Sequence, residues 1–130
     1  MGAWGTAPFD NDDASDWVYE LEKNGIEAIE SALTNAMVAT DLEMPDDVDA
    51  IAAGEVIAAA LGRPAPGLRE DILSLASGLA DHVSRDHARR AQEAAERVLA
   101  SSEVADLWAE TDSNAEWRGL VDDLIRRLAS

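Results

Sequence analysis

Apolar residues recur every three or four positions along almost the whole chain, and no segment alternates apolar and polar residues with a period of two. Such spacing is typical of amphipathic α-helices, because side chains three and four positions apart lie on one helix face. We therefore expect an all-α fold, a compact single-domain bundle of about six main helices plus one short helix. The predicted helices cover residues 11–23, 26–40, 46–61, 68–82 and 85–100, a short segment over 103–110, and the chain from 114 onward.

Residues typical of helix ends stand at several of these boundaries. The Asn24-Gly25 pair supplies a stop after the first helix, and Ser84 is a good N-cap for the fifth. Ser113 and Glu116 have the spacing of a capping box, which predicts the start of the last helix.

The stretch GRPAPG at residues 62–67 is the one linker-like segment in the sequence. Six residues are an ordinary length for a helix connection, so we expect residues 1–130 to form a single all-helical domain. Residues 1–10 carry no helical pattern, and we expect them to be an extended N-terminal segment docked on the bundle.

The helix over residues 46–61 differs from the others because it is apolar nearly all round, which predicts a central position. Glu55 lies inside its segment IAAGEVIAAAL, so this carboxylate is expected to be at least partly buried. Burying a carboxylate is costly unless it is paired or hydrogen-bonded. Glu55 is then either a structural acceptor for backbone N–H groups or an arginine, which we favour, or a functional base or ligand anchor with a raised pKa.

The chain opens with MGAWGTAPFDNDDASDW, which contains two tryptophans and four aspartates. We expect Asp10 to be the N-cap of the first helix with Asp13 three residues on, and Phe9 to begin a hydrophobic staple. Gly5 allows a tight turn. Trp4 is either an anchor packed into the helical core or an exposed contact residue.

The aspartates also raise the question of a metal site. An EF-hand loop starting at Asp10 would require a ligand, a glycine and a glutamate at its fifth, sixth and twelfth positions. The chain has Ala14, Ser15 and Leu21 there, so that template fails. Asp12, Asp16 and Glu20 form an acidic ladder at i,i+4 spacing. Either a divalent cation or an arginine from the second half could relieve their repulsion; we expect an arginine, and no metal.

Charge is distributed unevenly along the chain. There are 27 acidic and 10 basic residues, a net charge of −17, and residues 1–62 contain 14 acids against the single base Lys23. Nucleic-acid binding requires a basic face, so we exclude it. Such acidity suits solubility, which we favour as its explanation, salt tolerance or a basic partner. In the second half, Asp123 and Arg127 have the i,i+4 spacing of an ion pair.

Other chemistry finds little support in the sequence. There is no cysteine, no apolar run near the ~20 residues that span a bilayer, and no basic segment at the start, so we expect a cytoplasmic protein without membrane attachment. Nucleophile-elbow, dinucleotide, P-loop and zinc-protease motifs are all absent. We therefore predict no catalytic residues and no cofactor.

The start M-G-x-W-G-x-x-P-F-D-N-D, followed by D-W, resembles a bacterial family defined as domain of unknown function 4259. Two later stretches, AAGEVIAAALGRP and VADLWAE…EWRGLVDDLIRRL, are also similar to it, so the resemblance covers essentially the whole chain. It supplies no activity, cofactor or partner. It implies that the opening motif and Glu55 belong to one structural unit, and we expect Glu55 to accept hydrogen bonds from the opening segment. The candidate binding or family-motif residues are Trp4, Gly5, Phe9, Asp10, Asn11, Asp12, Asp16, Trp17 and Glu55.

Two classes of function remain open. We favour a small acidic, non-enzymatic interaction module that binds a basic protein partner, an inhibitor or immunity-type protein being the sharpest version, as a monomer or weak homo-oligomer. The alternative is a metal-dependent or carboxylate-based hydrolase that uses Glu55 with Asp10, Asp12 and Asp16.

Overall fold

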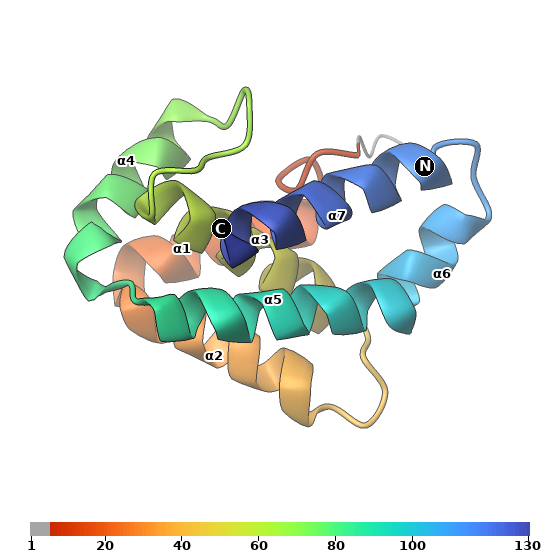
Figure 1. Cartoon of the computed structure of the whole chain (residues 1–130). Helices are drawn as coiled ribbons and strands as arrows, with labels where there is room; N and C mark the ends of the chain where they lie inside the picture. Colours follow the sequence, from red (N-terminus) through yellow and green to blue (C-terminus); the bar gives the residue numbers. More distant parts are fainter. Residues whose placement is uncertain (1–5) are drawn as a thin grey trace.

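The computed structural model describes residues 6–130, which form seven α-helices and one short 3₁₀ helix around a central helix, so the all-α prediction is confirmed (Figure 1). In chain order the elements are α1 (Asp12–Asn24), α2 (Ile26–Val38), α3 (Asp46–Ala60), α4 (Glu70–Leu79), η1 (Ala80–His82), α5 (Arg85–Ala100), α6 (Glu103–Ala109) and α7 (Asn114–Ala129). The predicted fourth helix thus ends three residues earlier as an α-helix and continues as η1.

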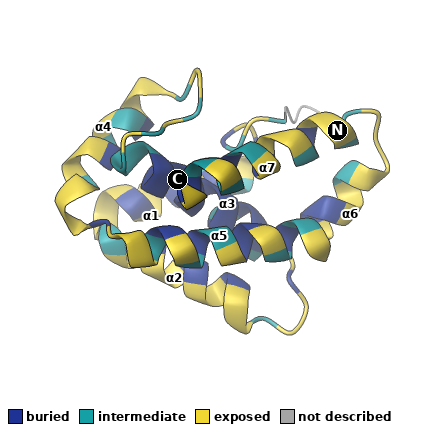
Figure 2. Cartoon of the chain, viewed as in Figure 1, coloured by how far each residue is buried: buried dark blue, intermediate teal, exposed yellow. Residues whose placement is uncertain are grey.

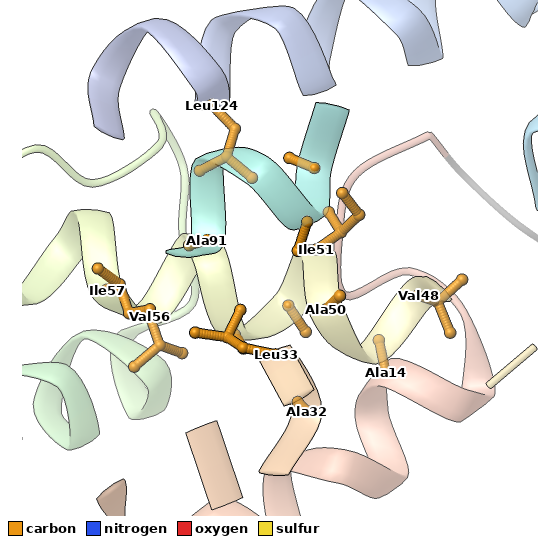
Figure 3. Packing of buried hydrophobic residues seen from close by; sticks show 14 of the residues in the cluster. Ala14, Ala32, Leu33, Val48, Ala50, Ile51, Val56, Ile57, Ala91 and Leu124 are labelled. Atoms are coloured by element: carbon orange, nitrogen blue, oxygen red, sulfur yellow. The ribbon is translucent and has the colours of Figure 1, made fainter. Parts of the chain in front are cut away.

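Helix α3 lies at the centre and contacts α1, α2, α4, α5, α6 and α7. Figure 2 shows it as a dark blue segment among helices whose outer faces are exposed. Its small residues let neighbours approach closely: a Cβ on Gly54 would lie 3.1 Å from Cδ2 of Leu124 on α7 and 3.8 Å from Cβ of Ala91 on α5. Figure 3 shows Leu124 and Ala91 packed over α3. The nearly all-apolar pattern therefore predicted the place of this helix correctly.

The start of α1 differs from the prediction by one residue. The N-cap is Asn11, whose Oδ1 accepts the N–H of Ala14 at 2.7 Å, whereas Asp10 is exposed outside the helix. Asn11 has the extended backbone that an N-cap requires, and its short amide reaches the third helical N–H. Phe9 is buried in the core, but it stands two residues before the cap, so the staple predicted directly before the N-cap is wrong: Asp10 occupies that position. At the other end Gly25, with a φ of 60°, donates its N–H to Leu21 and ends the helix.

The two predicted serine caps have opposite outcomes. Ser84 forms a capping box with His87: its Oγ accepts the His87 N–H at 3.4 Å, and Nδ1 of His87 accepts the Ser84 N–H at 3.1 Å. Ser113 makes no side-chain cap, so the predicted box with Glu116 is wrong. Glu116 instead accepts a hydrogen bond from the hydroxyl of Thr6 at 2.6 Å, a contact that ties the described part of the N-terminal segment to α7.

Asp47 fastens α6 to α3. Its side chain is fully buried, and its carboxylate accepts the N–H of Val48 at 2.7 Å and that of Val104, in the first turn of α6, at 2.8 Å. Burial raises the pKa of Asp47 to about 6, while these backbone hydrogen bonds oppose the rise.

Replacing Asp47 by asparagine is expected to destabilise the fold by about 1–2 kcal/mol at pH 8, because an amide NH₂ cannot accept both N–H groups. The loss is limited because the variant also removes a buried charge. Urea unfolding measures the loss, and hydrogen exchange at the Val104 amide should become faster. Asp112→Asn, at an exposed position, is the control. Unchanged protection at Val104 would show that Asp47 does not hold α6.

Candidate binding surface

Glu55 is buried, with 2% of its surface exposed, and its partner is an arginine. Nη1 and Nη2 of Arg127 donate to the two carboxylate oxygens at 3.1 Å each. Arg127 also donates to Asp123 at 2.8 Å, the i,i+4 pair expected on α7, and to the carbonyl of Arg63 at 3.1 Å. Burial raises the pKa of Glu55, and the hydrogen bonds and charge of Arg127 oppose that rise. This geometry agrees with the interpretation of Glu55 as a structural carboxylate that is paired with an arginine.

The expected hydrogen bonds from the opening segment to Glu55 are absent for residues 6–12, since the donors to Glu55 among described residues belong to Arg127. Glu55 and the opening segment nevertheless lie close to each other. Glu55, Asn11 and Thr6 line one cavity of about 20 Å³, close to the minimum for a single water molecule. The opening motif and Glu55 therefore meet across a small space and are not directly bonded. The aromatic side chains of Trp108 and Trp117 close the same cavity.

The remaining candidates from the opening stretch divide into core and surface. Phe9, Asn11 and Trp17 are buried, and Asp10, Asp12 and Asp16 are exposed. Trp4 and Gly5 lie outside the described residues. Within residues 6–130, no three histidine or carboxylate side chains are grouped so that they could hold a metal ion.

A hollow of about 340 Å³ lies between α1, α2 and α3, and we call it the acidic groove. Each of the three helices contributes at least one carboxylate to its walls. It is lined by Trp17, Glu20, Asn24, Glu27, Ala28, Ser31, Ala32, Asn35, Asp46 and Asp49.

The carboxylates of the acidic groove have no cationic partner within the described part of the chain. None of Glu20, Glu27, Asp46 and Asp49 is in an ion pair there, and Glu20 only accepts a hydrogen bond from Asn24 at 3.3 Å. The arginines of the second half are used elsewhere. Arg97 donates to the carbonyls of Ala36 and Ala39, which end α2, and Arg127 binds Glu55. The expectation that an arginine neutralises Asp12, Asp16 and Glu20 is therefore wrong for residues 6–130.

Asp49 has the most unusual environment in the acidic groove. Its Oδ1 is buried without a hydrogen-bond partner. Burial raises the pKa of Asp49 to about 7, and the negative charges of Asp13, Asp46, Asp47 and Asp16 add to the rise. A cation placed beside this carboxylate would offset the repulsion by the neighbouring aspartates.

Sequence reasoning missed the acidic groove because its parts were explained separately. The positive end of the helix dipole favours carboxylates such as Asp46, Asp47 and Asp49 in the first turn of α3, which accounts for them without any neighbouring helix. One signal was available: the helix they begin is apolar all round, so some of its first-turn carboxylates had to face other helices.

The fold and this surface define a small acidic all-α domain. Within the described residues, no helix is long and apolar enough to cross a membrane. Residues 2–119 match the model of the family described as Domain of unknown function (DUF4259), and the chain belongs to that family. No curated protein and no solved structure matches this chain.

Proposed function

We propose that this protein is a non-enzymatic interaction module whose acidic face on α1, α2 and α3 binds a basic protein partner. An inhibitor or immunity-type protein is the sharpest version: it would cover a basic surface of its target with the negative charge of this face. The observation that carries the proposal is the acidic groove, whose carboxylates have no ion pair among residues 6–130. A basic partner would lower the electrostatic energy of this face.

The hydrolase alternative has weaker support in the geometry. Both oxygens of Glu55 are engaged by Arg127, which leaves this carboxylate poorly placed to act as a base. Asp10, Asp12 and Asp16 are exposed, and none of them forms a hydrogen bond with Glu55. A thermal-shift screen with millimolar divalent cations addresses this alternative directly. A rise in Tm that disappears on replacing Asp12 and Asp16 by asparagine would favour it over the interaction module.

Hexa-arginine is expected to bind the protein at low salt and to lose at least about tenfold in affinity between 50 and 500 mM NaCl, because screening weakens exposed charge pairs. Isothermal titration calorimetry measures the effect. The triple variant Glu20→Gln/Glu27→Gln/Asp46→Asn should bind more weakly than the matched control Glu110→Gln/Asp112→Asn/Asp122→Asn. That control removes the same number of charges from exposed positions in another part of the molecule. The absence of binding, or equal losses in both variants, would contradict the proposal.

A further inference from the structure

We propose that the acidic groove is the pocket for one arginine side chain of the basic partner. This inference rests on the proposed function and narrows it from an acidic face to a defined site with a defined ligand group. The pocket is the hollow between α1, α2 and α3, and Asp49 is its anchor.

Hydrogen-bond acceptors stand on every wall of the acidic groove. Helix α1 supplies Glu20, α2 supplies Glu27 and Asn35, and α3 supplies Asp46 and Asp49. A guanidinium group has five N–H donors in a planar fork and can reach acceptors on more than one wall. With a volume of about 340 Å³, the hollow has room for such a side chain.

Asp49 is the residue beside which a positive charge would stabilise the groove. Its Oδ1 is buried and lacks a hydrogen-bond partner, while four other aspartates on α1 and α3 repel its charge. A single guanidinium in the groove beside Asp49 would offset this repulsion and donate to the carboxylates that line the groove at the same time. Such charge-assisted hydrogen bonds are stronger than neutral ones, especially where water is partly excluded.

The surroundings favour arginine over other cations. The described residues offer no group of three or more ligating side chains for a metal ion. Trp17 forms an apolar wall of the acidic groove, and a flat guanidinium, more weakly hydrated than an ammonium, tolerates such a wall better than lysine does. An arginine side chain therefore matches the groove in both charge and shape.

The test uses three capped tripeptides, Ala-Arg-Ala, Ala-Lys-Ala and Ala-citrulline-Ala, titrated into the isotopically labelled full chain at low salt. The side-chain N–H signals of Trp17, Asn24 and Asn35 report on the groove directly. We expect these three signals to move with the arginine peptide, to move less with lysine, and to stay in place with citrulline, which is similar in shape but uncharged.

The key variant is Asp49→Asn, and Asp122→Asn, which removes one exposed charge on α7, is its matched control. We expect Asp49→Asn to weaken binding of the arginine peptide at least about fivefold at pH 8, and Asp122→Asn less than twofold. Asp49→Asn removes a carboxylate whose charge is buried at a cost, so it should fold at least as well as the wild type, and unchanged backbone spectra would verify this.

Two results would overturn the inference. One is an unmoved set of groove signals while hexa-arginine still binds in a salt-dependent way; the basic-partner proposal would then survive and the groove would not be its site. The other is an equal loss of affinity in Asp49→Asn and Asp122→Asn. If hexa-arginine itself does not bind at low salt, the proposed function fails first.

Discussion

Arg127→Met is expected to destabilise the protein by about 3–5 kcal/mol at pH 8, because it leaves the buried carboxylate of Glu55 without its cation. Both oxygens of Glu55 accept from this guanidinium at 3.1 Å, and burial already raises the pKa of Glu55 against the opposing effect of Arg127. Removing Arg127 should raise that pKa further. The carboxyl then takes up a proton as the pH falls, so the loss of stability should be smaller at pH 5 than at pH 8.

Two further variants distinguish the contribution of the ion pair to stability from that of the neighbouring hydrogen bonds. Glu55→Gln should cost less, about 1–2 kcal/mol, because Arg127 keeps its hydrogen bonds to Asp123 and to the carbonyl of Arg63. The double variant Glu55→Leu/Arg127→Met should recover much of the loss, since apolar residues of similar volume often replace buried ion pairs without great cost. Urea unfolding at both pH values gives the free energies. A loss below 1 kcal/mol for Arg127→Met would show that Glu55 does not depend on this partner.

The features that were predicted correctly from the sequence are those that depend on the residue pattern of a single helix. The period of apolar residues located the helices, and the unbroken apolar run of α3 predicted its central position. The same run predicted that Glu55 is buried and needs a partner. Its environment was therefore predictable, but the identity of that partner was not, because Arg127 reaches Glu55 across 72 residues of sequence.

The predictions that were wrong depended on geometry between elements. Asp10 and Asn11 are both good N-caps by residue type, and the choice between them follows from the path of the incoming chain. Ser113 and Glu116 have the spacing of a capping box, yet Glu116 is used by Thr6 instead. The acidic groove belongs to the same class, since three helices must pack before its walls face one another.

The stability of the wild type is expected to fall by about 1–3 kcal/mol between pH 5 and pH 8, and Asp49 should contribute more to this fall than Asp47 does. Burial, with the charges of Asp13, Asp46, Asp47 and Asp16, raises its pKa from 3.8 to about 7. The folded protein then binds a proton that the unfolded chain releases near pH 4. A stabilising contribution of this sign is complete below pH 3.8 and is lost as the pH rises through about 7. Asp47, with a pKa of about 6, contributes in the same direction.

Asp49→Asn isolates this contribution because it fixes the side chain in a neutral form of nearly the same size. Urea unfolding at pH 5, 6, 7 and 8 should give a flatter profile for Asp49→Asn than for the wild type. The variant should be the more stable of the two at pH 8, by about 1–2 kcal/mol after allowance for its partial exposure to solvent. Asp122→Asn, which removes an exposed charge on α7, should leave the slope of the wild type unchanged. Parallel profiles for the wild type and Asp49→Asn would mean that Asp49 is ionised at neutral pH without cost. In that case the acidic groove would not hold the unfavourable charge that a basic side chain is proposed to relieve.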